Sequence, residues 1–373
     1  MENNRYMKYL GIIISLIIIV FMILLIVLEK YEFSENENRF LSDFPIISFD
    51  NFLSGELSSK LDTFVNDHFP YRNSFVKLKN KVELLSGKTK INNVFIGRDG
   101  YLIEEYKTSK KLDKFINVIN KFKNNNDVSV TLMLVPNSVL INEDKLPYMA
   151  STINQYDDIK YVYSKVDADT IDLYDILVNN NKKYQMYYKL DHHWTSYGAY
   201  FAYVEYAKKY NLNYLELNEY DIEEVTDIFY GTLYSKVIMD KIKGEKIHIF
   251  NKDEDLLVKY YLGNNIVTKN SLYEYSYLDK KDKYSIFLNN NNPLVTIKNN
   301  LVNNNKKIIV IKDSYANSFI PFLTSNFEEV HVIDPRYYKE SISNYINEFN
   351  IEQVLFLYNM NNLERDTGIY SIK

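Results

Sequence analysis

Residues 128–135 read VSVTLMLV, a continuous apolar run rich in β-branched side chains. Such a run is typical of a strand that is buried on both faces of a parallel sheet. Segments whose apolar residues have helical spacing lie before or between this run and similar runs. The strand-like runs are residues 128–135, 308–311, 330–333 and 354–358, and the helical stretches are residues 153–165, 195–210, 315–326 and 339–349. Because strands alternate with helices, the sequence predicts an α/β fold, a three-layer α/β/α sandwich with a mostly parallel sheet.

Two regions depart from this alternation. Residues 61–85 have helical spacing that is interrupted at Phe69-Pro70, and a strand, turn and strand follow at residues 93–103 around Arg98-Asp99-Gly100. Residues 211–300 contain polar loops, short alternating strands and an asparagine tract at 289–292. We interpret residues 211–300 as an insertion that decorates the sheet, not as an independent domain.

The N-terminal segment predicts a membrane anchor. Residues 9–28, YLGIIISLIIIVFMILLIVL, carry no charge, and as a helix they would span about 30 Å, the thickness of the hydrocarbon core. No small-residue cleavage pattern follows, so we expect the helix to be retained. Arg5 and Lys8 precede it, whereas Glu29, Glu32, Glu35 and Glu37 follow it, and this bias places the N-terminus inside.

This reading gives a domain plan. We expect residues 1–30 to be a cytoplasmic tip and transmembrane anchor, residues 31–60 a stalk that meets the domain, and residues 61–373 one extracytoplasmic domain. The chain would then be a single-pass protein of the cell membrane. Its net charge of −5 argues against a nucleic-acid binder, and the absence of cysteine excludes disulfides, thiolate metal sites and a cysteine nucleophile.

Two segments hold candidate chemistry. Residues 306–318, KKIIVIKDSYANS, carry a buried strand into Ser314, with a helix expected directly behind it. A serine at the carboxyl end of such a strand has backbone N–H groups nearby for an oxyanion, but it needs a base that is oriented by an acid. The segment KLDHHWTSYG, residues 189–198, supplies an Asp-x-His pair in Asp191 and His193.

Each segment also has a simpler interpretation. An Asp-Ser pair after a strand is often a helix cap. The two histidines, with Asp191 as a third ligand, could form a metal site. Adjacent residues of an extended segment point in opposite directions, however, so chelation by both His192 and His193 is awkward. We therefore expect no metal and no cofactor.

Together these segments resemble the DHHW family, a branch of the SGNH-hydrolase-like proteins related to the alginate O-acetyltransferases. The resemblance rests on residues 191–194 (DHHW) and on several motifs in order along the chain. These are residues 37–41 (ENRFL) with Phe44-Pro45, residues 66–72 (NDHFPYR), residues 96–102 (IGRDGYL), residues 230–233 (YGTL) and Asp313-Ser314. It implies an SGNH-hydrolase-like sandwich and a catalytic set of Asp191, His193 and Ser314, with His192 at the variable position.

The resemblance also implies a reaction. Ser314 would take an acetyl group and pass it to a sugar hydroxyl, with His193 as the base and Asp191 holding its tautomer. We add Arg336, after a later strand, and Asn137, after the strand ending at Val135, as candidates for acceptor binding or charge stabilisation.

Two functions stay open at this stage. The first is a serine-dependent O-acetyltransferase or acetylesterase acting on a cell-surface polysaccharide, exopolysaccharide or wall polymer. By analogy, a membrane-embedded acyltransferase would be its partner. The alternative is a non-catalytic glycan-binding or assembly protein of a surface-polymer export complex. Complete retention of Asp191, His193 and Ser314 favours the enzyme, because a scaffold has no need of all three.

Overall fold

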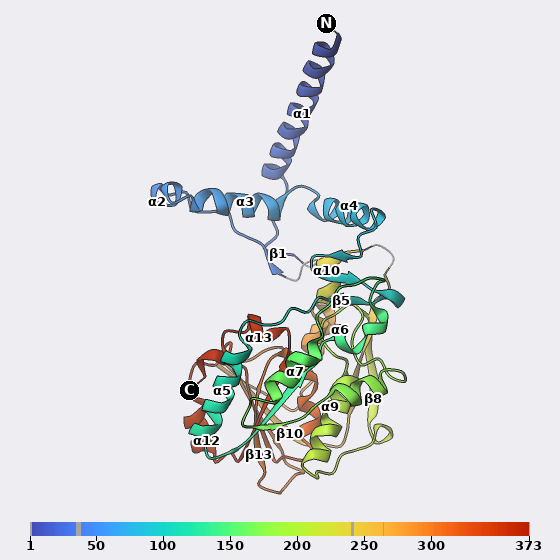
Figure 1. Cartoon of the computed structure of the whole chain (residues 1–373). Helices are drawn as coiled ribbons and strands as arrows, with labels where there is room; N and C mark the ends of the chain where they lie inside the picture. The colour runs from blue at the N-terminus through green and yellow to red at the C-terminus, as the bar shows by residue number, and fades with distance from the viewer. Residues whose placement is uncertain (1, 35–38, 240–241, 264, 373) are drawn as a thin grey trace. The chain divides into compact units, whose positions relative to one another are not determined.

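The computed structural model describes residues 2–34, 39–239, 242–263 and 265–372 (Figure 1). The chain divides into two compact units, Met1–Lys88 with Ser235–Lys241, and Thr89–Tyr234 with Ile242–Lys373. The predicted boundary at residue 61 falls inside the first unit, so the division of function at that residue stays a prediction. Glu35, Glu37 and Asn38, which entered the charge bias and the motif at residues 37–41, lie outside the described residues.

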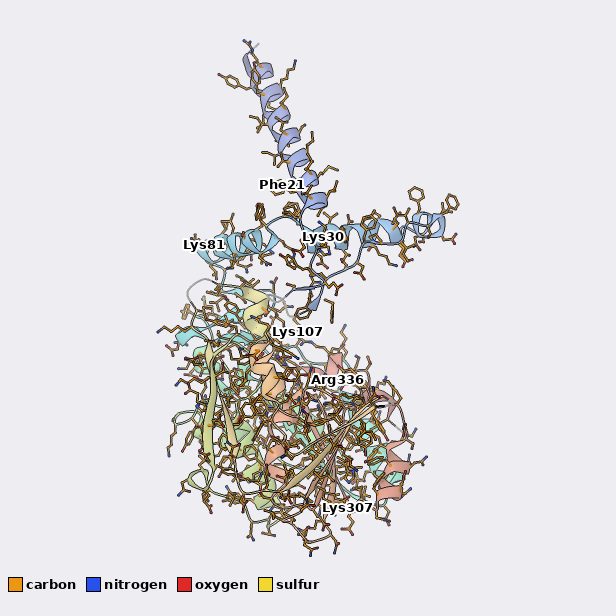
Figure 2. All side chains as sticks on the ribbon, turned by 180° about the vertical axis from the view of Figure 1, so that it is seen from behind. Phe21, Lys30, Lys81, Lys107, Lys307 and Arg336 are labelled. Atoms are coloured by element: carbon orange, nitrogen blue, oxygen red, sulfur yellow. The ribbon has the colours of Figure 1, made fainter. Side chains whose placement is uncertain are left out.

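In the described part of the first unit, the long N-terminal helix is followed by shorter helices. Helix α1 is Glu2–Val27, and Arg5–Val27 within it is long and apolar enough to cross a membrane and has no fully buried residue (Figure 2). Strands β1 (Phe33–Ser34) and β2 (Arg39–Phe40) pair antiparallel. Helices α2 (Phe49–Leu53), α3 (Glu56–His68) and α4 (Arg72–Leu85) follow, and the predicted interruption at Phe69-Pro70 separates α3 from α4.

The second unit is built on a mixed sheet. Among the described residues this sheet has eight strands, in the order β11-β10-β12-β14-β13-β15-β6-β7. The five adjacent described strands from β14 to β7 run parallel to one another. Strands β10, β11 and β12 extend the sheet in antiparallel pairing. The bounds are β6 Ser129–Val135, β7 Asp169–Thr170, β10 Leu256–Leu262, β11 Asn265–Lys269, β12 Leu294–Asn299, β13 Lys307–Lys312, β14 Glu329–Ile333 and β15 Gln353–Asn359.

Helices cover both faces of this sheet, which confirms the predicted three layers. Successive buried residues of β13 face opposite layers: Val310 packs with α9 (Ser196–Lys209), whereas Ile311 packs with α5 (Leu112–Asn125). On the α9 side lie also α8 (Tyr174–Asn180) and α11 (Ile320–Leu323), and on the α5 side lie α7 (Gln155–Tyr163) and α12 (Ile342–Phe349). The continuous apolar strands are therefore explained by burial on both faces.

Residues 211–300 do more than decorate the sheet. Strands β8 (Asp221–Phe229) and β9 (Glu245–Asn251) form a separate antiparallel hairpin, but β10, β11 and β12 continue the main sheet. The alternating burial along β10 explains why its sequence looked unlike the central strands, because it has one buried face instead of two.

The remaining elements are short. Strands β3 (Lys90–Ile91), β4 (Val94–Ile96) and β5 (Leu102–Glu104) form a small antiparallel sheet, with the turn Arg98–Gly100 in the predicted place. The other helices are α6 Ser138–Ile141, α10 Thr232–Val237 and α13 Asn362–Arg365. The single helix expected at residues 315–326 is instead a 3-10 helix, η6 (Ser314–Ser318), followed by α11, because Pro321 begins a new helix. The other 3-10 helices are Glu143–Lys145, Leu217–Glu219, Tyr275–Asp279, Lys283–Ile286 and Ile369–Ser371.

Candidate active site

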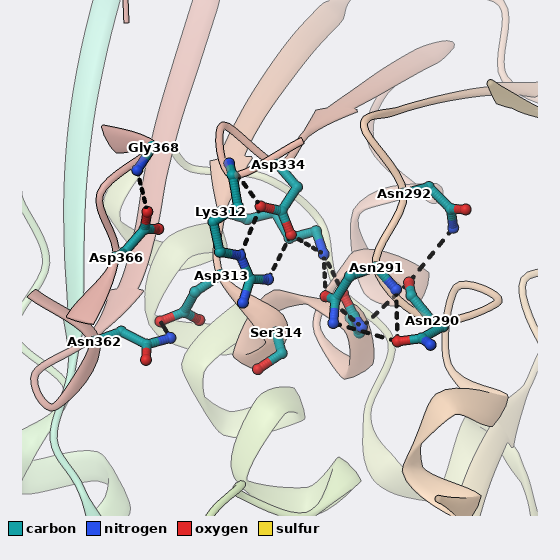
Figure 3. Close-up of polar contacts among 12 residues, drawn as sticks. Asn290, Asn291, Asn292, Lys312, Asp313, Ser314, Asp334, Asn362, Asp366 and Gly368 are labelled. Atoms are coloured by element: carbon teal, nitrogen blue, oxygen red, sulfur yellow. Dashed lines mark hydrogen bonds and ion pairs between the residues drawn. The ribbon is translucent and has the colours of Figure 1, made fainter. Parts of the chain in front are cut away.

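Ser314 lies where the carboxyl ends of the parallel strands meet, directly after β13 (Figure 3). Asp313 fixes this turn. Its Oδ1 accepts a hydrogen bond from the Tyr315 N–H at 2.9 Å, and its Oδ2 accepts from the Asn359 N–H at 2.8 Å and from Asn362 Nδ2 at 3.0 Å. Burial raises the pKa of the Asp313 carboxyl, while these donors act in the opposite direction. The turn that carries Ser314 is therefore tied to the end of β15.

The loop that carries Asp191 and His193 is attached to the serine turn by Trp194. The fully buried indole donates from Nε1 to the Tyr315 carbonyl at 2.9 Å and to Ser318 Oγ at 3.0 Å. Directly after the loop, Thr195 caps α9 and accepts from the Gly198 N–H at 3.4 Å. The predicted start of a helix at this point is correct, and it holds the end of the loop rigidly.

The structure brings Asp191, His193 and Ser314 into one hydrogen-bonded chain. His193 Nδ1 lies 2.6 Å from Asp191 Oδ1, and His193 Nε2 lies 2.8 Å from Ser314 Oγ. The His193 backbone N–H also donates to Asp191 Oδ1 at 3.0 Å. Because an ionised carboxylate only accepts, Nδ1 carries the ring proton and the unprotonated Nε2 faces the serine hydroxyl. This is the arrangement in which an imidazole can remove the hydroxyl proton.

Asp191 is held from its other side by Thr232. The Thr232 N–H and Oγ1 donate to Asp191 Oδ2 at 2.7 Å and 2.9 Å. Gly231 permits this approach, since a Cβ at that position would lie 2.3 Å from the same oxygen. Burial by itself would raise the pKa of Asp191, but the imidazoles of His192 and His193 and the hydrogen bonds from His193 and Thr232 hold it well below its usual value.

His192 stands beside this chain. Its Nδ1 lies 2.6 Å from Thr232 Oγ1, and its ring centroid lies 3.9 Å from that of His193. Since the single Thr232 hydroxyl hydrogen is given to Asp191, the hydrogen between His192 and Thr232 belongs to His192 Nδ1. A line of donors thus runs from His192 through Thr232 to Asp191.

Asp191, His192 and His193 are also the residues of the alternative metal site. Asp191, His192 and His193 can offer ligand atoms within 4.8 Å of one another. Both ring nitrogens of His193 already have hydrogen-bond partners, however, and Asp191 already accepts from His193 and Thr232. A metal would have to displace Asp191 or Ser314 from His193, so this donor set fits proton transfer better than metal binding.

Two further residues shape the site, and our sequence analysis did not identify either. Tyr284 stacks on the His193 ring with centroids 3.8 Å apart and planes 8° from parallel, and its hydroxyl donates to the Ser314 carbonyl at 3.3 Å. The buried Glu245 carboxylate accepts from the Lys189 and Leu190 N–H groups at 2.7 Å and 2.6 Å. Burial raises the pKa of Glu245 to about 7.

Their signals in the sequence were weak or absent. Tyr284 is one of 35 tyrosines, and Glu245 lies in an ordinary-looking strand, so neither stands out without the fold. Gly231 and Thr232 were visible within the motif YGTL, but the motif gave them no role.

Asn137 and Arg336, the candidates for acceptor binding or charge stabilisation, are tied into neighbouring networks. The Asn137 amide donates to Tyr315 Oη at 3.1 Å and accepts from Gln155 Nε2 at 2.9 Å. The Arg336 guanidinium pairs with Asp334 at 2.5 Å and 2.8 Å. Burial opposes the charge of Arg336, but Asp334 raises its pKa above the ordinary value. Both side chains thus have structural partners, and their roles toward an acceptor stay predictions.

Comparison with solved structures finds the same fold in other proteins. A DHHW family protein from Eubacterium siraeum has a TM-score of 0.67 and 24% identity, with 76% of this chain and 96% of that chain covered. PatB1 of Bacillus cereus, with a sulfonyl adduct, has a TM-score of 0.64 and 20% identity, with coverage of 75% and 98%. The O-acetyltransferase domain of Pseudomonas putida AlgJ has a TM-score of 0.45 and 11% identity, with 75% of this chain and 96% of that chain covered.

Comparison with curated protein sequences gives no match. The family comparison is decisive, because the DHHW protein model matches residues 87–333, more than half of the chain and a range that contains Asp191, His193 and Ser314. The chain therefore belongs to the DHHW protein family.

Proposed function

We propose that this protein is a membrane-anchored, SGNH-like acyltransferase or esterase that acts on O-acetyl groups of a cell-surface or exported polysaccharide. The observation that carries the proposal is the continuous hydrogen-bonded chain from Asp191 through His193 to Ser314, with distances of 2.6 Å and 2.8 Å. A cap or a scaffold has no use for an unprotonated imidazole nitrogen aimed at a serine hydroxyl.

In the first step Ser314 Oγ attacks the carbonyl carbon of an acetyl donor while His193 Nε2 takes the hydroxyl proton. The bond from the carbonyl carbon to the leaving oxygen then breaks, and that oxygen takes the proton from His193. An acetyl ester on Ser314 is left. Asp191 stabilises the imidazolium that forms between these two proton transfers, and the Ser314 N–H is available to the developing oxyanion.

In the second step an acceptor hydroxyl replaces the leaving group. His193 Nε2 takes the acceptor proton, the acceptor oxygen attacks the acetyl carbonyl carbon, and Ser314 Oγ leaves and regains its proton. A sugar hydroxyl as acceptor makes the protein a transferase, and water makes it an esterase. Both outcomes use the same three side chains.

The location follows from α1 and from the charge bias around it. A retained helix at Arg5–Val27, with Arg5 and Lys8 in its first two turns and acidic residues after it, would hold residues 61–373 outside the cytoplasm. There the protein would meet exported polysaccharide, the acceptor class implied by the resemblance to alginate O-acetyltransferases. By the same analogy, a membrane-embedded acyltransferase would deliver the acetyl group across the bilayer.

The test uses the full-length chain in detergent and a chromogenic acetyl ester. Ser314→Ala and His193→Ala are each expected to lower kcat by roughly 10⁴ to 10⁶, as removal of a member of such a set does. Ser164→Ala, which changes an exposed serine at the end of α7, is the control and should leave the rate unchanged. A sulfonyl fluoride should add one sulfonyl group per chain, on Ser314.

The opposite result is equally clear. If wild type is acylated neither by the ester nor by the sulfonyl fluoride, and its rate equals that of Ser314→Ala, the reaction is not a property of this chain. A glycan-binding or assembly role would then replace the enzyme.

A further inference from the structure

Helix α4 has an apolar stripe that its own unit leaves largely exposed. Phe75, Leu78, Val82 and Leu85 follow one another at intervals of three, four and three residues. At about 100° per residue, these positions lie within roughly 80° of one another on the helix surface. Their exposed fractions are 46%, 57%, 56% and 79%. A surface helix normally turns such a stripe toward a core.

The opposite side of α4 is the one that is held. Asn80, roughly 180° from the middle of the stripe, is the buried residue of the helix, and its amide donates to the Val237 carbonyl within the same unit. A polar side chain thus faces the chain, and the apolar side chains face outward. This reversal indicates that an apolar environment outside the unit covers the stripe.

A second exposed apolar segment lies in the same unit. It runs from the end of the stalk into α2 and has exposed fractions between 68% and 81% at Ile46, Ile47, Phe49, Phe52 and Leu53. Contiguous exposed apolar surface of this kind marks a protein or membrane interaction site.

The charges of α4 favour a membrane over a protein as the partner of this apolar surface. The helix carries Arg72, Lys77, Lys79 and Lys81 against a single acid, Glu83. Lys79 and Lys81 each lie roughly 80° from the middle of the stripe, one on either side (Figure 2 labels Lys81). An apolar stripe flanked by lysines is the pattern of a helix lying in a membrane interface, where the lysine stems cover apolar surface and the ammonium groups meet anionic headgroups.

Contacts with α1 support the same occupant. Phe21 of α1 stacks on Phe69 at 5.1 Å between ring centroids and lies 6.0 Å from Phe75, the first residue of the stripe. Phe21 is six residues before the end of α1, which is about 9 Å along the helix. If α1 spans the bilayer, the start of α4 therefore lies within about 9 Å of the outer boundary.

We infer that the α4 stripe and residues 46–53 insert into the interface of an anionic lipid bilayer, with Lys79 and Lys81 at the headgroups. The inference rests on the proposed anchoring by α1 and adds a second, peripheral attachment that follows directly after it. An amphipathic helix of this kind binds through buried apolar area together with attraction to anionic lipid.

The test exploits the absence of cysteine from the chain. Full-length single-cysteine variants Leu78→Cys and Val82→Cys are labelled with an environment-sensitive fluorophore and reconstituted into vesicles of phosphatidylcholine and phosphatidylglycerol. Asn73→Cys, on the opposite side of α4, is the matched control, and Tyr148→Cys, an exposed position in the other unit, is the distant one. Ile17→Cys reports on α1 itself, and Ser314-dependent ester cleavage is measured in the same vesicles.

We expect the probes at residues 78 and 82 to emit at shorter wavelength than those at residues 73 and 148, and to be quenched by lipids brominated on the acyl chain. Removing the anionic lipid, or changing Lys79 and Lys81 to glutamine, should weaken this quenching, by about fivefold in surface affinity for each lysine. If the two stripe probes behave like the probe at residue 148, the inference is wrong. Emission at shorter wavelength without lipid quenching also overturns it, in favour of a protein contact.

These outcomes are separate from those of the proposed function. An unquenched probe at residue 17 would remove the anchor, but the stripe probes would still decide the inference. Loss of ester cleavage would bear on Ser314 alone.

Discussion

Replacing Thr232 with valine tests whether the acid of the proposed catalytic chain must be held from behind. The change keeps the shape of the side chain but removes Oγ1, which lies 2.9 Å from Asp191 Oδ2 and 2.6 Å from His192 Nδ1. The Thr232 N–H, at 2.7 Å from the same carboxylate oxygen, is retained. Asp191 therefore loses one of its two donors on this side and keeps the other.

The magnitude follows from the lost hydrogen bond. A hydrogen bond to a charged group is worth about 1.5–3 kcal/mol, and about 1.4 kcal/mol corresponds to a factor of ten in rate. Thr232→Val is thus expected to lower kcat/KM between about tenfold and a hundredfold. Removing the function of the acid itself typically costs about 10⁴, so the variant should remain well above Asp191→Asn.

The assay is kcat/KM for a chromogenic acetyl ester, measured beside the thermal unfolding of each variant. Thr232→Ser, which restores Oγ1, should return the rate toward wild type. His192→Phe keeps an aromatic ring beside His193 without Nδ1, and so separates an effect through His192 from one through Asp191.

A wild-type rate in a Thr232→Val variant that thermal unfolding shows to be folded would refute the reasoning. A lower rate that Thr232→Ser does not restore would assign Thr232 a role in packing, not one that acts through Oγ1 on Asp191.

Other side chains give further predictions. Gly231→Ala places a Cβ 2.3 Å from Asp191 Oδ2, so kcat/KM should fall as far as in Asp191→Ala, with a loss of about 1–3 kcal/mol in denaturant unfolding; near-normal turnover would contradict this. The pKa of Glu245 is raised from 4.5 to about 7, so the folded state binds its proton more tightly and stability falls as pH rises through this window. Glu245→Gln should remove up to about 3 kcal/mol of that fall in unfolding measured from pH 4 to 8, and an unchanged slope would exclude the residue. Lys312→Met removes a buried ammonium that lies 3.4 Å from Asp334 and donates to Asn291 and Asn317. Because Arg336 still pairs with Asp334, the change should cost about 1–3 kcal/mol in the same unfolding assay, and an unchanged stability would contradict this.

The central strands could be predicted because their sequence records their burial. Residues 128–135 have no polar face, and the matching strand β6 is buried on both faces at Ser129–Val135, except at its first residue. The helix that begins after Thr195 could be placed for a similar reason, since its cap is local. The edge strands β10 and β11 were not assigned to the main sheet, because a half-buried antiparallel strand has the same alternation wherever it pairs.

In the candidate site, too, contacts between residues close in the sequence could be predicted, and contacts between distant residues could not be predicted from spacing alone. Asp191 and His193 are two residues apart, so an extended loop brings their side chains together by itself. Ser314 is 121 residues away from His193, and only the ordered motifs of the family connected the two before the fold did. Tyr284 and Glu245 belong to no such motif, and their contacts exist only once the chain is folded.

Through these supporting residues, the region 211–300 has a role in the site that its irregular sequence did not indicate. Thr232 holds the acid, Glu245 holds the backbone that leads into Asp191, and Tyr284 stacks on the base. Each comes from this region, whereas Asp191, His193 and Ser314 come from the segments around it. A serine, a histidine and an aspartate on loops must be fixed to within a fraction of an ångström for proton transfer. The region that breaks the α/β alternation therefore acts together with Asp313 and Trp194 in fixing the geometry of the proposed catalytic chain.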